Sequence, residues 1–191
     1  WCWPDKEREP DLPIDDSDMG CDCAEKCPID PPWKRQIDAI AIAPGDAITD
    51  DGQETWNLLA ERGIDRVLIC GVHTNMCVLG RPFAIRQLVR LGKRVALIRD
   101  LTDTMYNSKM RPFVDHFTGT DLVIVGHQYF SMCAITSTDL TGKPAFRFGE
   151  DQRAPGGRPA AASALAAPAP VAAGYPEEGG AREASVSPSR P

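Results

Sequence analysis

The sequence predicts an α/β fold, a three-layer sandwich in which helices cover both faces of a parallel sheet. Two short, nearly all-apolar runs, at 66–70 and 94–98, have the composition of strands that are covered on both faces. Two stretches with helical periodicity, at 53–62 and 75–91, each end at a glycine. Strands that alternate with helices through short connections form right-handed βαβ units, and these build a parallel sheet.

The first quarter of the chain holds an irregular segment and the first predicted strand. Residues 1–36 contain many Pro, Asp and Cys without sustained periodicity, so we expect irregular structure there. The run Ile37–Ile42 has the apolar content of a strand, and a polar turn region follows at 45–52.

The remaining elements follow in order along the chain. The helix predicted at 53–62 has Trp56 and Leu59 on one face. A short helix at 111–117 and a strand at 122–125 are the last two predicted elements. Trp1, Trp3 and Trp33, in the irregular segment, either pack against the sheet or form a lid over the pocket, and packing is the favoured interpretation.

The chain divides into three parts by composition. Residues 1–36 form the irregular N-terminal segment of the domain and residues 37–150 its α/β core. From 151 to 191 the chain is mostly Ala, Pro, Gly and Ser, with too few large apolar side chains to offset the entropy of ordering. We expect a disordered tail there, which alternatively serves as a tether or a partner motif.

Composition and charge exclude several classes of function. The 191 residues are 42% hydrophobic and 25% charged, which are ordinary globular values. The net charge of -6 repels phosphate backbones, so nucleic acid is not an expected partner. No apolar run is long enough to cross a bilayer, so no membrane span is expected in this segment. A cytoplasmic location is favoured, and export stays open.

The strongest chemical signal lies between Cys70 and Val78. Ligand sites in parallel sheets lie beyond the carboxyl ends of the strands, and this stretch follows a predicted strand. Cys77 is expected in the first turn of the next helix, where free backbone N–H groups favour a thiolate. The thiolate is the nucleophilic form of cysteine, so the position suits covalent catalysis. The alternative is that Cys77 is a small buried apolar residue.

The stretch Gly71–Val78, GVHTNMCV, resembles the nucleophile motif of the isochorismatase-like cysteine hydrolases, such as nicotinamidases, N-carbamoylsarcosine amidases and ureidoacrylate amidases. The flanking residues 58–65 and 92–95 and Asp100 also match, and the resemblance extends over roughly residues 40–125. It implies an α/β sandwich with Rossmann-like topology, a small-molecule substrate and a homo-oligomer. It further implies that Cys77 is the nucleophile.

The resemblance also implies the geometry of the oxyanion site. In the family a cis peptide follows the Gly-Val step, which here is the bond between Val72 and His73. Carried over, the backbone N–H groups of His73 and Cys77 would donate to the substrate's carbonyl oxygen. The imidazole of His73 either lines the pocket or packs.

The sequence departs from the family at the other two members of the Asp-Lys-Cys triad. The general-base Asp should lie upstream of Trp1, so the chain is expected to lack the N-terminal part of the fold. The lysine should follow the strand at 37–42, where the sequence reads Ala43–Asp46 without one. Lys34 is the remaining candidate, with a solvated surface lysine as the alternative interpretation.

Three functions follow from these residues. The first is hydrolysis of a small amide or related C–N bond by the Cys77 thiolate and a backbone oxyanion hole. The second is a non-catalytic binding or scaffold protein of the same fold, because the triad is incomplete. The third and weakest is a thiol redox protein that uses Cys70 and Cys77. Two features argue against it: Cys70 is expected to be buried, and the pair lacks Cys-x-x-Cys spacing.

The cysteines of the N-terminal segment suggest a disulfide rather than a metal site. The spacing Cys21-x-Cys23-x-x-x-Cys27 is not that of a standard zinc knuckle, and no fourth ligand pair follows. A disulfide among Cys2, Cys21, Cys23 and Cys27 is expected if the protein is exported, and free thiols if it is cytosolic. His73, His116 and His127 are too scattered to be ligands. We therefore predict no metal and no cofactor.

Overall fold

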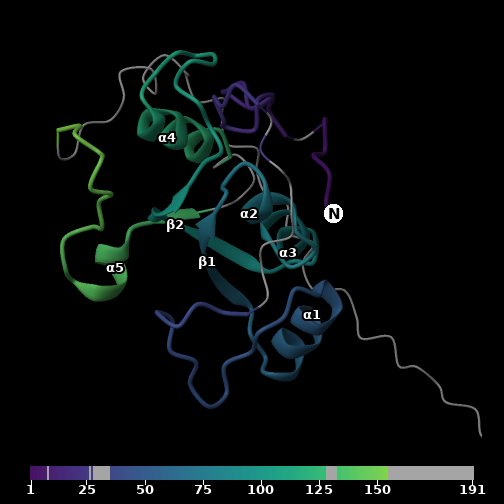
Figure 1. The fold of residues 1–191 in the computed structure, drawn as a ribbon. Helices are drawn as coiled ribbons and strands as arrows, with labels where there is room; N and C mark the ends of the chain where they lie inside the picture. Colours follow the sequence, from purple (N-terminus) through teal and green to yellow (C-terminus); the bar gives the residue numbers. More distant parts are fainter. Residues whose placement is uncertain (8, 26, 28–34, 128–132, 155–191) are drawn as a thin grey trace, which may run out of the picture.

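A computed structural model describes residues 1–154, except for 8, 26, 28–34 and 128–132. Three strands form one parallel sheet in the order β1-β2-β3 (Figure 1). The strands are β1 (Arg66–Val72), β2 (Arg94–Asp103) and β3 (Cys133–Ile135). Arg66 pairs with Arg94, and Ala96 with Cys133. The predicted α/β class with a parallel sheet is confirmed.

Five helices accompany the sheet in the described part of the chain: α1 (Gly52–Glu61), α2 (Cys77–Gly80), α3 (Ile85–Arg90), α4 (His116–His127) and α5 (Ser137–Thr141). The helix α1 matches the helix predicted at 53–62, because residues next to its two ends determine where it starts and stops. The Asp51 carboxylate caps it by accepting from the N–H groups of Gln53 (2.7 Å) and Glu54 (2.9 Å). Gly63, at φ +61°, ends it in the left-handed conformation.

The single helix predicted at 75–91 is wrong, since the structure has two short helices there. The helix α2 ends at Gly80, and Arg81 is extended, with φ -66° and ψ 153°. Pro82 explains the break, because a residue before proline disfavours the helical conformation and proline has no N–H to donate. The helix α3 starts three residues after Pro82, at Ile85.

The strand predicted at 122–125 is also wrong, because these residues lie inside α4. The helix starts at His116 and not at Arg111, where the chain is still irregular. Leu122, Val123 and Ile124 are all buried, so α4 is apolar on several sides. A short apolar run of this kind occurs in buried helices and in buried strands alike, and periodicity does not separate them.

The strand predicted at 37–42 is not formed. Ile37, Ile40 and Ile42 are 60%, 55% and 53% exposed, and the segment is a series of turns and extended stretches. A strand needs a neighbour to take up its backbone hydrogen bonds. Among the described residues, none pairs with this segment.

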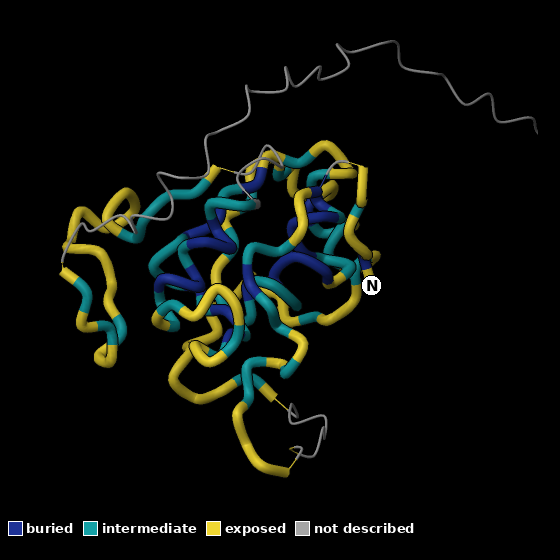
Figure 2. Tube along the Cα trace, turned by 90° about the horizontal axis from the view of Figure 1, so that it is seen from above, coloured by how far each residue is buried: buried dark blue, intermediate teal, exposed yellow. Residues whose placement is uncertain are grey.

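The two longer strands differ in how they are covered. Leu97 and Ile98, neighbours in β2 that point to opposite faces, are both buried. In β1, by contrast, burial alternates, and Leu68 and Val72 are about half exposed. The prediction that the run at 66–70 is covered on both faces is therefore wrong for one face. Figure 2 shows the buried stretches gathered in the interior of the described chain.

One cluster of apolar side chains joins the sheet to its helices. Leu79 of α2, Ile85 of α3, Leu97 of β2 and Ile124 of α4 are almost inaccessible, with at most 1% exposed. Close packing of this kind fixes α2, and with it Cys77, against the sheet.

The segment 1–25 has no helix or strand in its described residues, as expected, but it is anchored on the core. The Glu9 carboxylate accepts from Nε of Arg86 at 2.7 Å, with both side chains buried. Trp1 lies on the backbone of Gly80, where an added Cβ would come within 2.6 Å of the indole. Trp1 therefore packs on α2 rather than on the sheet, and Trp3 is 71% exposed. Trp33 lies outside the described residues.

The predicted tail at 151–191 lies outside the described residues beyond 154. Arg153, inside the described range, contacts Asp121 of α4 at 2.7 Å. Within the described residues, no helix has the length and apolar character needed to cross a membrane.

Candidate functional site

The turn from β1 into α2 carries Cys77. The strand ends at Val72, and Cys77 is the first residue of α2, at the carboxyl edge of the sheet. Its side chain is neither buried nor fully exposed. Gly71, at φ +113°, has a backbone conformation that residues with a Cβ rarely adopt. The structure therefore puts Cys77 at the predicted edge, although α2 has only four residues.

Three backbone N–H groups of this turn have no acceptor among the described residues, and one of them is the N–H group of Asn75. The peptide bond between Val72 and His73 is cis, at the step where the resemblance implies one. The His73 carbonyl accepts from the N–H groups of Met76 and Val78, each at 3.1 Å. The N–H groups of His73 and Cys77 have no acceptor among the described residues.

Threonine hydroxyls brace the turn against β2. The Thr74 hydroxyl lies 2.7 Å from that of Thr102 and donates to the Asp103 carbonyl at 2.8 Å. The Thr102 hydroxyl donates to the Gly71 carbonyl at 2.7 Å. Thr74 and Thr102 are each 2% exposed, so this network sets the turn's position from inside the protein.

Asn75 connects the turn to two further loops. Its Nδ2 donates to Asp16 Oδ2 at 2.8 Å and to the Met105 carbonyl at 3.1 Å. Its Oδ1 accepts from the Met105 N–H at 2.9 Å. Sequence reasoning missed Asp16 and Met105, because nothing in a single sequence indicates that residue 16 folds back onto residue 75.

An ion pair lies where β2 ends. His116 Nε2 is 2.8 Å from Asp103 Oδ1, and Nδ1 is 2.8 Å from the Tyr106 carbonyl. Both partners are acceptors, so the imidazolium form satisfies both contacts. The hydrogen bond to Asp103 raises the pKa of His116. Burial by itself would raise the pKa of Asp103, but the hydrogen bonds from His116, Thr104 and Thr120 outweigh it and lower that pKa.

The other predicted members of the site are not brought to Cys77. No side chain of the described residues hydrogen-bonds to the Cys77 thiol, and the imidazole of His73 has no such partner either. Lys34 lies outside the described residues. Cys70, expected within a buried strand, is exposed because it points from the uncovered face of β1.

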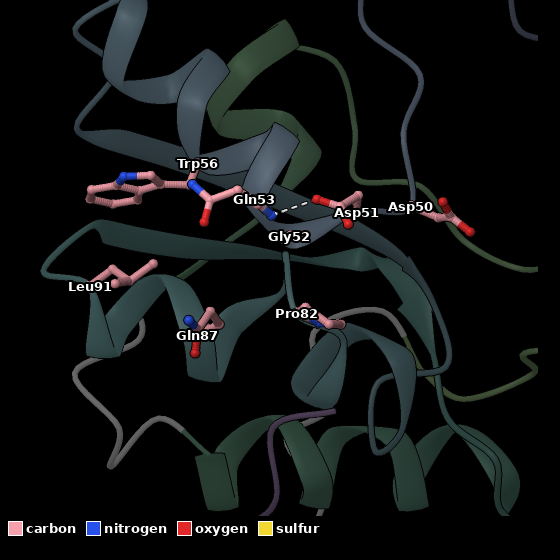
Figure 3. Close-up of a pocket in the computed structure, with 8 residues that line it drawn as sticks. All are labelled: Asp50, Asp51, Gly52, Gln53, Trp56, Pro82, Gln87 and Leu91. Atoms are coloured by element: carbon pink, nitrogen blue, oxygen red, sulfur yellow. Dashed lines mark hydrogen bonds between the residues drawn. The ribbon is translucent and has the colours of Figure 1, made fainter.

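A cavity of about 430 Å³ lies elsewhere, between α1 and the segment from Pro82 to Leu91 (Figure 3). Its lining residues are Asp50, Asp51, Gly52, Gln53, Trp56, Pro82, Gln87 and Leu91. None of them belongs to the turn at 71–78. The Lys93 ammonium lies 5.0 Å from the centre of the Trp56 ring, a cation–π contact at the edge of this region.

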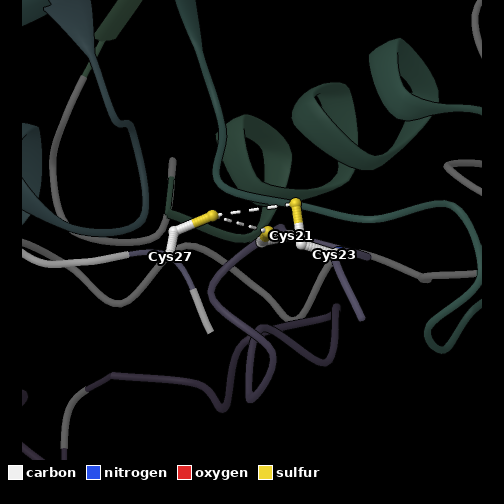
Figure 4. Close-up of side chains that lie close together, drawn as sticks. All are labelled: Cys21, Cys23 and Cys27. Atoms are coloured by element: carbon white, nitrogen blue, oxygen red, sulfur yellow. Dashed lines mark hydrogen bonds between the residues drawn. The ribbon is translucent and has the colours of Figure 1, made fainter. Parts of the chain in front are cut away.

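The cysteines of the N-terminal segment are free thiols in the structure. Cys2 is buried and donates to Gln87 at 3.3 Å. The other three, Cys21, Cys23 and Cys27, converge on one another (Figure 4), with sulfur separations of 3.5 Å for Cys21–Cys27 and 3.7 Å for Cys23–Cys27. The Cys23 N–H lowers the pKa of Cys21, whereas the two neighbouring thiols raise the pKa of Cys23 to about 11.

Comparison with known proteins gives a match to a family model. Neither the curated proteins nor the solved structures gave a match to the chain. A family model described as the isochorismatase domain matches residues 27–125, just over half of the 191 residues, and this match suggests a hydrolase of a kind that is often cysteine-dependent. The matched range contains β1, β2 and the turn with Cys77. The chain therefore belongs to the isochorismatase domain family.

Proposed function

We propose that this protein is a cysteine-dependent hydrolase of a small amide or related C–N bond, with the Cys77 thiolate as its nucleophile. The observation that carries the proposal is the turn from β1 into α2, where a partly accessible thiol lies in the same loop as the N–H groups of His73 and Cys77, which have no acceptor in the described part of the chain. A nucleophile and preorganised donors are the two parts that acyl transfer needs.

The reaction proceeds in two halves. The Cys77 thiolate attacks the carbonyl carbon of the amide, and the N–H groups of His73 and Cys77 donate hydrogen bonds to the carbonyl oxygen as negative charge develops on it. The C–N bond then breaks, the amine leaves with a proton, and a thioester remains on Cys77. Water hydrolyses the thioester to the carboxylic acid and returns the thiol. Loss of one oxyanion donor typically slows such a reaction about 100- to 1000-fold.

The acceptor for the thiol proton is not supplied by the described residues. Within them, no carboxylate, imidazole or amine hydrogen-bonds to Cys77. Lys34 stays the predicted lysine of the site, and the small-molecule substrate and the homo-oligomer stay predictions from the family resemblance.

The test measures amine or ammonia release from a panel of small primary amides and N-carbamoyl compounds. We expect turnover by the full chain and a loss of about 10⁴-fold or more in Cys77→Ser, because a missing nucleophile removes the covalent pathway. Cys70→Ser is the matched control, since this exposed thiol of β1 is expected to leave the rate unchanged. Mass spectrometry of the quenched reaction should find the acyl group on the peptide that contains Cys77.

Unchanged turnover in Cys77→Ser would refute the proposal. The second candidate is a non-catalytic binding protein of the same family, and the thiol's lack of a hydrogen-bond partner among the described residues favours it. That candidate predicts no turnover on any amide of the panel, together with ligand-induced stabilisation that persists in Cys77→Ser. The two readouts therefore separate the candidates.

A further inference from the structure

We propose that Cys21, Cys23 and Cys27 form a three-thiolate site for a zinc-like divalent cation. The site lies in the N-terminal segment and is separate from Cys77. It does not depend on the function proposed above.

The sulfur positions already match a tetrahedral ion. With Zn–S bonds of about 2.3 Å, two sulfurs of a tetrahedron lie about 3.8 Å apart, and two sulfurs around a planar three-coordinate ion about 4.0 Å apart. In the structure two of the separations are 3.5 and 3.7 Å, and all three sulfurs lie within 4.8 Å of one another (Figure 4). The thiols therefore reach three vertices of a tetrahedron with small adjustments.

The ligand chemistry selects a thiophilic metal. Thiolates favour zinc and similar ions over magnesium or calcium, which prefer oxygen ligands. The Cys23 N–H points to the Cys21 sulfur at 3.4 Å, and such outer-shell donors orient and stabilise a metal-bound thiolate. The described residues provide three sulfur ligands of the four that a tetrahedral ion takes.

The start of the cysteine loop is held in place before any ion binds. Gly20 packs so closely on the loop after β2 that an added Cβ would lie 2.9 Å from the Tyr106 nitrogen. The Asp18 carboxylate accepts from the Gly20 N–H and from the Asn107 amide, each at 2.9 Å. A pre-positioned ligand lowers the ordering cost of binding, so this anchoring favours a site over a chance cluster.

The local charge is compatible with a cation. Asp22 lies between the first two cysteines, but its carboxylate is paired with Lys109, so the negative charge that attracts a cation comes from the thiolates. The three thiols themselves must lose protons to bind, which makes binding weaker as the pH falls. Cys21 is partly covered whereas Cys23 and Cys27 are exposed, so an ion reaches them directly from solvent.

A disulfide is the competing use of the same sulfurs. It would join two of them at about 2.0 Å, leave the third thiol free and require an oxidant for the two electrons released. Convergence of three sulfurs is what ligation needs, while a disulfide needs only two. The experiment must therefore report the redox state as well as the metal.

The test uses the full chain, reduced and freed of metal, and titrates it with Zn²⁺ against a chromophoric chelator. We expect one Zn²⁺ per chain and a loss of affinity of more than about 100-fold in Cys21→Ser, Cys23→Ser or Cys27→Ser. Cys133→Ser, which removes an exposed thiol in β3, is the control and should bind like the wild type. Substitution with Co²⁺ should give thiolate charge-transfer absorption in the wild type that each loop variant lacks.

Three outcomes would overturn the proposal: no Zn²⁺ bound by the reduced chain, equal affinity in Cys23→Ser, or a disulfide among the three cysteines in freshly isolated protein. If a variant fails to fold, a second measurement still tests the proposal: Zn²⁺ must slow the alkylation of all three thiols in the wild type. Amide turnover is unaffected by these outcomes, so failure here is distinct from failure of the proposed hydrolase.

Discussion

The two cysteine-bearing loops of this protein use the same side chain in opposite settings. Cys77 is alone, and the backbone around it is fixed by β1, β2 and buried threonines. Cys21, Cys23 and Cys27 lie in a loop without regular structure and contact mainly one another. A nucleophile needs an isolated thiol among free donors, whereas a metal site needs several thiols that converge. The difference teaches that the surroundings, and not the residue type, separate the two proposed chemistries.

The two loops are nevertheless linked through one asparagine. Asn75, two residues before Cys77, holds Asp16, and Asp16 lies on the segment that continues into Cys21. Substitutions that cut this link, or that act on one side of it, test whether the loops are independent.

The largest effect is expected from Asn75→Ala. The substitution removes three hydrogen bonds and leaves the Met105 N–H without its acceptor, at a cost of about 1–3 kcal/mol in the free energy of unfolding. Since small displacements of reacting groups are costly, we also expect kcat/KM to fall about 100-fold. Chemical denaturation and the amide assay measure the two effects.

Asn107→Ala is the matched control for Asn75→Ala. Asn107 also binds the N-terminal segment, through Asp18, but its side chain makes no hydrogen bond to a described residue of the turn that holds Cys77. It should weaken Zn²⁺ binding and spare turnover. Equal loss of turnover in both variants would show that the segment as a whole, and not the Asn75 link, positions Cys77.

A smaller effect, confined to the other loop, is expected from Gly20→Ala. At φ +71° a side chain costs about 1–2 kcal/mol, and the new Cβ would also press on the backbone of Tyr106. We expect Zn²⁺ affinity to fall about tenfold, because the cysteine loop loses its anchor. Gly45→Ala meets a similar positive φ, +97°, in open space, so it should leave Zn²⁺ affinity unchanged. Similar Zn²⁺ affinities in both variants would mean that the anchor is unimportant.

The smallest effect is the pH dependence of the ion pair beside the turn. The pKa of His116 is raised in the folded state, so its stabilisation is complete below the unfolded value of about 6.5 and is lost as pH rises through the folded pKa. The pKa of Asp103 is lowered, so its contribution is present above about 3.9 and is lost as pH falls through the folded pKa. The pair therefore stabilises the fold between these limits.

Thermal unfolding should show this as a midpoint that falls when the pH is raised above about 6.5. The change should be below about 1 kcal/mol, since both side chains are partly exposed to solvent. In His116→Gln the decline should disappear, because glutamine donates without titrating. Parallel pH profiles for wild type and variant would assign the decline to other groups.

The sequence predicted those elements whose signals are local. The Asp51 cap and the Gly63 stop define α1, and the apolar run at 94–98 marks the buried part of β2. The elements that were predicted wrongly depend on distant partners. The run at 122–125 lies in the buried helix α4, which its apolar composition does not distinguish from a buried strand. The segment 37–42 is exposed, and no described strand lies beside it.

The candidate site divides in the same way. Cys77 and the backbone of His73 lie in one continuous motif, so a single sequence was enough to locate them. Asp16 and Met105 reach the turn only through the tertiary fold, and their contacts have no counterpart in spacing or composition. The spacing of Cys21, Cys23 and Cys27 was interpreted as favouring a disulfide over a metal, and the sulfur separations on which the proposed metal site rests required the structure.

The packing of Trp1 on Gly80 has an optical consequence. The indole covers the last residue of α2, three positions after Cys77, and the guanidinium of Arg81 lies 5.7 Å from the ring centre. Because Trp1 is 44% exposed, a small shift of α2 changes how much water reaches the indole. Its fluorescence, isolated by difference from Trp1→Phe, would therefore follow events at Cys77 in real time without an added label.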